Sequence, residues 1–172
     1  MNYKIYGPFK IPRESEGLIS RDAKTRRAFW ADIDERMEGL SGACGCYILT
    51  IRNKAWYVGM AEKQSFKMEC FQPHKIVQYD LAIGKGKGVP HLIFLAKITP
   101  SEYFSVPSKR GHSDIRQLEQ LLIGSAINRN PQLCNIRNTK TLREIIVPGF
   151  LNTKKGQSNS NSVKEFKKAI GV

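Results

Sequence analysis

Two tyrosines near the middle of the chain have the type and spacing for chemistry on a phosphate. They are Tyr47 and Tyr57, one in each half of the segment Gly45 to Gly59, GCYILTIRNKAWYVG. Apolar, β-branched halves on either side of the turn-prone Arg52-Asn53-Lys54 predict a β-hairpin. On one face of a hairpin, two phenols can stand side by side, where they can activate water and position a phosphate. The structural alternative is that both are ordinary strand residues of a hairpin core.

A carboxylate further along the chain lies in an apolar stripe. In the segment IRQLEQLLIGSAI, Glu119 falls four residues after Ile115 and three before Leu122, so a helix places all three on one face. Burying a carboxylate without a partner costs several kcal/mol, so Glu119 is expected to have a cation, a metal or a catalytic role. A salt bridge to a lysine or arginine is the structural alternative.

These residues together resemble a nuclease family. The pair G-C-Y and Y-V-G, followed in order by His74, Glu119 and Asn135, resembles the GIY-YIG nuclease superfamily over roughly Gly45 to Asn138. The resemblance implies an α/β (α+β) fold, with a small, mainly antiparallel three-stranded sheet flanked by helices. It also implies a metal-dependent endonuclease that hydrolyses DNA phosphodiester bonds with Mg2+ or Mn2+.

The resemblance also implies a role for each motif residue. Tyr47 would help to deprotonate the attacking water, and Tyr57 would contact the phosphate or that water. Glu119 would hold one divalent cation, and a hard oxygen ligand suits magnesium. Asn135 would support the site by hydrogen bonding, and His74 completes the expected catalytic set.

One family feature is missing. The usual arginine lies one helical turn before the histidine, but the residue four before His74 is Cys70. An unbroken helix would place Lys67, Cys70 and His74 on one face, so Lys67 is one candidate for the phosphate and Lys75 is another. Lysine gives a point charge rather than a planar bidentate fork. The alternative function is therefore a non-catalytic nucleic-acid-binding protein on a degenerate GIY-YIG fold.

The charge of the chain indicates a polyanionic partner. The 172 residues carry a net charge of +13: residues 1–44 hold 8 basic and 7 acidic residues, 45–135 hold 12 and 6, and 136–172 hold 8 and 2. DNA is the expected partner, with RNA as an alternative. The sequence GKGKG at 84–88 predicts a mobile loop that can contact phosphate. The residues expected to contact phosphate or nucleic acid are Lys67, Lys75, Lys85, Lys87 and Asn135.

Other classes of protein are disfavoured. No apolar run is long enough to span a bilayer, and the start MNYKIYGPFK lacks the apolar stretch of a signal peptide, so we expect a soluble cytoplasmic protein with no membrane partner. A homodimer is left open. Without a secretion signal, the four cysteines are expected to be thiols. A zinc site built from Cys44, Cys46, Cys70 and His74 is an alternative to buried thiols.

The chain divides into three parts by these patterns. They are a 1–44 N-terminal extension with a packing helix, a 45–138 GIY-YIG-like catalytic domain and a 139–172 basic C-terminal extension. The expected elements are an irregular start at 1–19, a helix at 21–38, strands at 46–51, 55–58 and 91–98, a helix from 66 divided at Pro73, a helix at 114–127 and a last helix after Ser162.

Overall fold

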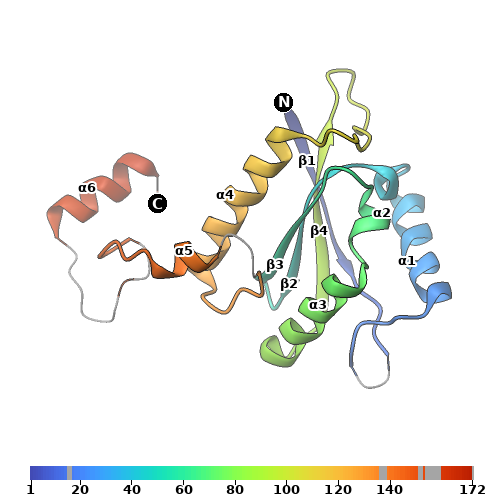
Figure 1. Ribbon diagram of the computed structural model, residues 1–172, viewed down its shortest axis with the longest axis horizontal. Helices are drawn as coiled ribbons and strands as arrows, with labels where there is room; N and C mark the ends of the chain where they lie inside the picture. The colour runs from blue at the N-terminus through green and yellow to red at the C-terminus, as the bar shows by residue number, and fades with distance from the viewer. Residues whose placement is uncertain (15–16, 136–138, 151–152, 154–159, 172) are drawn as a thin grey trace.

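Four antiparallel strands form the centre of the structure, one more than the sequence predicts (Figure 1). The computed structural model describes residues 1–14, 17–135, 139–150, 153 and 160–171. The strands are β1 (Asn2–Lys10), β2 (Gly45–Ile51), β3 (Lys54–Ala61) and β4 (Pro90–Ile98), in the spatial order β1-β4-β2-β3. The expectation of a mixed α and β fold is confirmed, and that of a three-stranded sheet is not.

The additional strand, β1, comes from the segment that was expected to be irregular. Gly7 and Pro8 indicate a break, but β1 pairs with β4 on both sides of them, with a register irregularity between Tyr6 and Phe9. An edge strand tolerates proline there because it has a neighbouring strand on one side only, so the missing N–H need not donate a hydrogen bond within the sheet. The N-terminal residues therefore belong to the same sheet as the tyrosine hairpin.

The hairpin itself forms as expected. Arg52 and Asn53 have φ values of 52° and 57°, as a two-residue type I′ turn requires. In the ladder, Tyr47 lies opposite Gly59 and Leu49 lies opposite Tyr57, so the two tyrosines share a face at diagonal positions.

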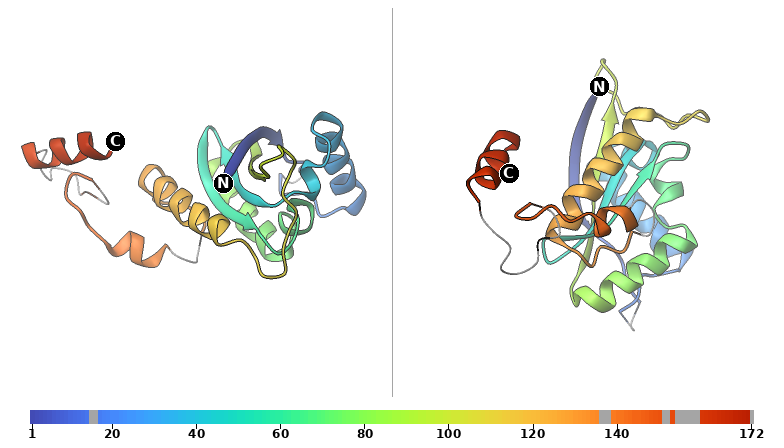
Figure 2. Two further views of the ribbon diagram at one scale, coloured as in Figure 1. Left: turned by 90° about the horizontal axis from the view of Figure 1, so that it is seen from above. Right: turned by 60° about the vertical axis from the view of Figure 1, so that its left-hand side comes forward.

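Helices cover both faces of the sheet (Figure 2). One face carries α1, α2 and α3, and the other face carries α4. The helices are α1 (Ala23–Arg36), the 3-10 turn η1 (Leu40–Gly42), α2 (Phe66–Glu69), α3 (Pro73–Gly86), α4 (Ser113–Arg129), α5 (Lys140–Glu144) and α6 (Asn161–Ile170). No helix in the described part of the chain combines the length and apolar character needed to cross a bilayer.

The alternation of side chains along β2 creates two cores. Tyr47 and Leu49 join the larger core beneath α1, α2 and α3, which also contains Trp30. Cys46 points to the opposite face and packs against Ile115 of α4. Because α1 supplies part of the larger core, its packing role is confirmed.

Helix α3 differs in length from the expectation. Pro73 divides it from α2 as expected, but the predicted loop at 84–88 is wrong, because α3 continues to Gly86 and Lys87 caps it with φ 47°. A Cβ on Gly86 would meet the Trp56 ring at 3.0 Å, so this glycine lets α3 pack closely on the hairpin. That packing offsets the cost of a helical glycine, about 1 kcal/mol.

Candidate active site

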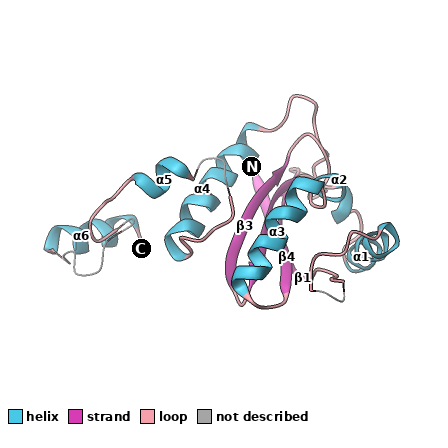
Figure 3. Ribbon diagram, turned by 60° about the horizontal axis from the view of Figure 1, so that its bottom comes forward, coloured by secondary structure: helices cyan, strands magenta, loops and turns pink. Residues whose placement is uncertain are grey.

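A pocket of about 460 Å3 opens at the β3 edge of the sheet, where α3 and α4 lie on either side of that strand (Figure 3). We call it the tyrosine pocket. It is lined by Tyr57, Met60, Glu69, His74, Lys75, Gln78, Glu119, Ile123 and Asn135. Five of the residues predicted from the sequence therefore meet here: Tyr57, His74, Lys75, Glu119 and Asn135.

Tyr57 and Lys75 form the polar centre of the pocket. The Lys75 ammonium donates to the Tyr57 hydroxyl at 2.9 Å and lies 3.2 Å from a Glu69 carboxylate oxygen. The Lys75 and Glu69 side chains are only 12% and 18% exposed, so this ion pair is largely shielded from solvent. Because the Tyr57 oxygen accepts from Lys75, its own O–H can donate to a phosphate or water oxygen in the pocket.

The protonation states follow from these contacts. Burial raises the pKa of Tyr57, although Lys75 opposes part of that shift. Burial would lower the pKa of Lys75, but Tyr57 and Glu69 together raise it. Near neutral pH, Tyr57 is therefore a phenol and Lys75 an ammonium, so this pair presents a donor and a cation rather than a base.

Tyr47 lies beneath the pocket and does not line it. Its side chain is fully buried, 6.3 Å from the Tyr57 ring between ring centroids. Burial raises the pKa of Tyr47 well above its ordinary value. By hydrogen-bond geometry, the buried hydroxyls of Tyr47 and Tyr79 have no partner among the described residues, although Tyr47 opposes part of the rise that burial causes in the pKa of Tyr79. Tyr47 is therefore placed to support Tyr57, not to touch a water in the pocket.

The two motif glycines have packing reasons of their own. A Cβ on Gly59 would overlap the Tyr47 ring, so Gly59 makes room for that tyrosine. Gly45 has φ +153°, and a Cβ there would overlap the Leu95 carbonyl oxygen.

Glu119 reaches the pocket from α4. It lies four residues after the buried Ile115 and four before the buried Ile123, so the expected position on the apolar face is confirmed. The carboxylate side of the pocket therefore depends on where α4 is held against the sheet.

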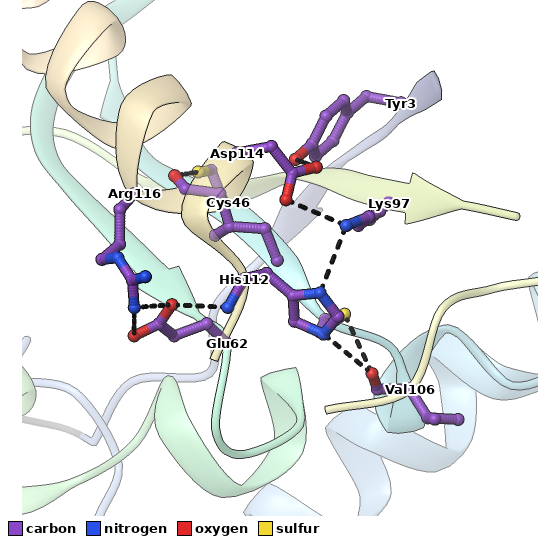
Figure 4. Close-up of polar contacts among 10 residues, drawn as sticks. Tyr3, Cys46, Glu62, Lys97, Val106, His112, Asp114 and Arg116 are labelled. Atoms are coloured by element: carbon purple, nitrogen blue, oxygen red, sulfur yellow. Dashed lines mark hydrogen bonds and ion pairs between the residues drawn. The ribbon is translucent and has the colours of Figure 1, made fainter. Parts of the chain in front are cut away.

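A network of polar residues fixes the start of α4 (Figure 4). Asp114 accepts from Lys97 of β4 at 2.9 Å and from the Tyr3 hydroxyl of β1 at 2.8 Å. Burial of Asp114 would raise its pKa, but the hydrogen bonds from Lys97 and Tyr3 hold it below the ordinary value. The Lys97 ammonium also lies 3.2 Å from Nδ1 of His112.

A second carboxylate completes this anchor. Glu62, directly after β3, accepts from both the His112 backbone N–H and the Arg116 guanidinium, each at 2.9 Å. The two carboxylates tie the first turn of α4 to three strands of the sheet, and so position Glu119 one turn further on.

Asn135 connects the last wall of the pocket to β3. Its side-chain oxygen accepts from the Val58 N–H at 2.9 Å, and its side-chain nitrogen donates to the Val58 carbonyl at 2.7 Å. Asn130 donates to the Ala55 carbonyl, and the Cys134 N–H donates to that of Trp56, both at 2.7 Å. Segment 130–135 therefore covers the β3 edge, which would otherwise expose backbone groups. The hydrogen bonds of the Asn135 side chain are thus directed at the strand, and its role in a catalytic site stays a prediction.

The remaining predicted lysines lie elsewhere. Lys67 is exposed on α2 and lines a separate hollow with Arg26 and Arg27. The unbroken helix that would align it with His74 is interrupted between Glu69 and Pro73. Lys85 and Lys87, at the end of α3, line two further hollows.

Carboxylate oxygens, the ligand type that a hard cation takes, are present in the tyrosine pocket. In the described lining the carboxylates are Glu69, which pairs with Lys75, and Glu119, and both polar atoms of the Asn135 side chain are bonded to Val58. Magnesium is commonly held by one or two carboxylates together with waters and substrate phosphate oxygens. Among the described residues, no group of three or more histidine, cysteine, aspartate or glutamate side chains is arranged to hold a metal.

The zinc alternative is wrong. Cys46 packs on the α4 face of the sheet and Cys70 in the core of the other face. All four cysteines are buried and form no disulfide, which confirms the expectation of thiols.

Glu69 and Tyr79 are pocket or core residues that the sequence reasoning missed. Glu69 looks like an exposed charge in the short segment FKME, and only the break before Pro73 turns it towards Lys75. Tyr79 packs edge-on against Tyr57 at 5.7 Å, and its position six residues after Pro73 on the buried face of α3 was a usable signal.

Comparison with protein-family models, with curated proteins and with solved structures finds no match to this chain. The GIY-YIG resemblance therefore depends on the motif residues.

Proposed function

We propose that the chain is a metal-dependent endonuclease that hydrolyses DNA phosphodiester bonds by a GIY-YIG-type mechanism. One observation carries the proposal: Tyr57, His74, Lys75, Glu119 and Asn135, from segments far apart in the sequence, line a single pocket. Phosphodiester hydrolysis needs a positioned water, positive charge at the phosphate and a group that takes a proton. The pocket offers a side chain for each task.

The scissile phosphate is bound by the donor pair. Lys75 supplies positive charge beside one non-bridging oxygen, and the Tyr57 O–H donates to another or to the attacking water. The lysine thus takes the task of the family's arginine from a different position on the helix.

Water attacks phosphorus, the bond to the leaving oxygen breaks, and one proton is lost from the water. His74, exposed and lining the pocket, is the residue we assign to accept that proton, because Tyr47 is buried and Tyr57 is a phenol hydrogen-bonded to Lys75. Glu119 would hold Mg2+ or Mn2+. When bound, such a cation stabilises the charge that develops on the phosphate and leaving oxygens.

The proposal is tested by Glu119→Gln, which keeps the shape and removes the charge. With Mg2+, we expect supercoiled plasmid to be nicked by the wild type and by the control Glu38→Gln, an exposed change outside the pocket, and the rate to fall at least 100-fold in Glu119→Gln. Equal rates in all three proteins would remove Glu119 from the reaction.

The second candidate is a non-catalytic nucleic-acid-binding protein. It is favoured because no arginine is among the described residues that line the pocket. It predicts DNA binding that weakens with salt, needs no metal and is unchanged by Glu119→Gln.

A further inference from the structure

A second hollow adjoins the tyrosine pocket. It has a volume of about 730 Å3, lies between α3 on one side and residues 131–135 and α5 on the other, and shares Gln78 and Asn135 with the pocket. We call it the basic groove. Its described lining is Gln78, Leu81, Lys85, Pro131, Gln132, Leu133, Cys134, Asn135, Thr139, Lys140, Arg143 and Glu144.

The charge of the lining changes along this path. The tyrosine pocket holds two carboxylates and one lysine, a lining that suits a metal. Among its described residues, the basic groove holds three cations, Lys85, Lys140 and Arg143, and one carboxylate, that of Glu144. A lining with three cations to one anion suits a polyanion rather than a metal.

The fold fixes the walls of the basic groove to the same segment that supports the pocket. The Thr139 hydroxyl donates to the Asn135 carbonyl at 2.8 Å, and the Arg143 guanidinium donates to the Leu133 carbonyl at 2.5 Å. These bonds hold α5 against segment 130–135, which is itself bonded to β3.

The cations of the two walls converge. Lys85 comes from the last turn of α3 and Arg143 from α5. Burial raises the pKa of the Cys134 thiol, whereas the positive charges of Lys85 and Arg143 both lower it. Both cations therefore act on the same thiol. Two elements separate in sequence thus direct positive charge to one place.

We propose that the basic groove binds the backbone phosphates of DNA on one side of the bond that is cut, with Lys85, Lys140 and Arg143 as the contacts. The occupant follows from charge complementarity and from continuity with the tyrosine pocket, because a strand whose phosphate lies beside Lys75 must leave along the surface. The inference rests on the proposed function, since it places the rest of the same substrate.

The test compares two triple variants with the same loss of charge. One is Lys85→Gln, Lys140→Gln and Arg143→Gln. The other is Lys10→Gln, Lys24→Gln and Arg27→Gln, all exposed residues on β1 and α1 that line neither the pocket nor the groove. Binding of a fluorescent DNA duplex is measured by anisotropy in EDTA across a range of salt concentrations, and cleavage separately with Mg2+.

For the groove variant we expect Kd at about 0.1 M salt to rise at least 10-fold, and the slope of log K against log salt to fall by about 2 to 3, at roughly 0.9 per lost phosphate contact. The control variant should change Kd less than threefold. Arg143 also holds α5 through its hydrogen bond to Leu133, so a double variant, Lys85→Gln and Lys140→Gln, leaves that bond intact. In the double variant the slope of log K against log salt should fall by about 1 to 2.

Equal losses of DNA affinity in the groove and control variants would overturn the inference, as would a wild type that does not bind the duplex. Failure of the nuclease proposal looks different: the wild type then fails to cut in Mg2+, while the contrast between the two variants in binding persists.

Discussion

Tyr47 and Tyr57 lie on the same face of one hairpin, yet their hydroxyls have different surroundings. Tyr57 shares a hydrogen bond with Lys75 at the pocket surface, whereas the Tyr47 hydroxyl is buried with no partner among the described residues. The sequence gives these two residues equal weight, because spacing along a strand shows which face a side chain is on and not what covers it.

Tyr47→Phe should therefore leave the free energy of unfolding unchanged or raise it by about 1 kcal/mol, because a buried hydroxyl without a partner contributes nothing that offsets its desolvation. Tyr3→Phe is the matched control: its hydroxyl donates to Asp114 at 2.8 Å, and its removal should cost about 1–3 kcal/mol. Urea unfolding measures both. A loss of more than about 1 kcal/mol in Tyr47→Phe would reveal a hydrogen bond at that hydroxyl.

Lys75→Gln should reduce kcat for DNA cleavage by about 100-fold or more, since it removes a positioned cation from the proposed phosphate site. It should also destabilise the protein, because among the described residues the Glu69 carboxylate would then keep only the hydrogen bond from Gln72. Lys63→Gln, an exposed change, is the control for both measurements. An unchanged kcat at saturating DNA would exclude Lys75 from the phosphate site.

At the scale of elements, the sequence predicts best where periodicity is strong. The hairpin, β4 and α4 are found close to their expected bounds because apolar alternation and helical stripes extend over many residues. β1 is missed because Gly7-Pro8 resembles a break, and only pairing with β4 compensates for it. Whether Lys67 or Lys75 lines the pocket depends on the interruption between α2 and α3, because that break sets the rotation of one helix relative to the other.

The cover over the β3 edge gives a prediction at this scale. Asn135→Ala removes both partners of the Val58 backbone and should cost about 2–4 kcal/mol, because a donor and an acceptor are left unsatisfied. Amide hydrogen exchange at Val58 should become faster. Asn128→Ala, exposed on α4, should have little effect on either measurement. Unchanged protection at Val58 would mean that segment 130–135 is held by other contacts.

At the scale of the whole molecule, Asp114 links β1, β4 and α4. Its folded pKa is lowered, so its contribution to stability is present above the unfolded value, about 3.9, and is lost as the pH falls through the folded value. Urea unfolding below about pH 4 should show a steeper loss of stability for the wild type than for Asp114→Asn. Asp32→Asn, at an exposed pair with Arg36, is the control. If the free energy of unfolding falls equally with pH in the wild type and in Asp114→Asn, groups other than Asp114 cause the loss of stability in acid.

In the proposed function, DNA crosses the molecule along the tyrosine pocket at the β3 edge, where the reaction is assigned, and along the adjoining basic groove. The most direct test incubates the wild-type protein with supercoiled, nicked and branched DNA in Mg2+, Mn2+ or EDTA. We expect at least one of these forms to be cut with either metal, as the proposed function requires, and none to be cut in EDTA. No cutting of any form with either metal, by protein that still binds DNA, would contradict it and leave a binding protein.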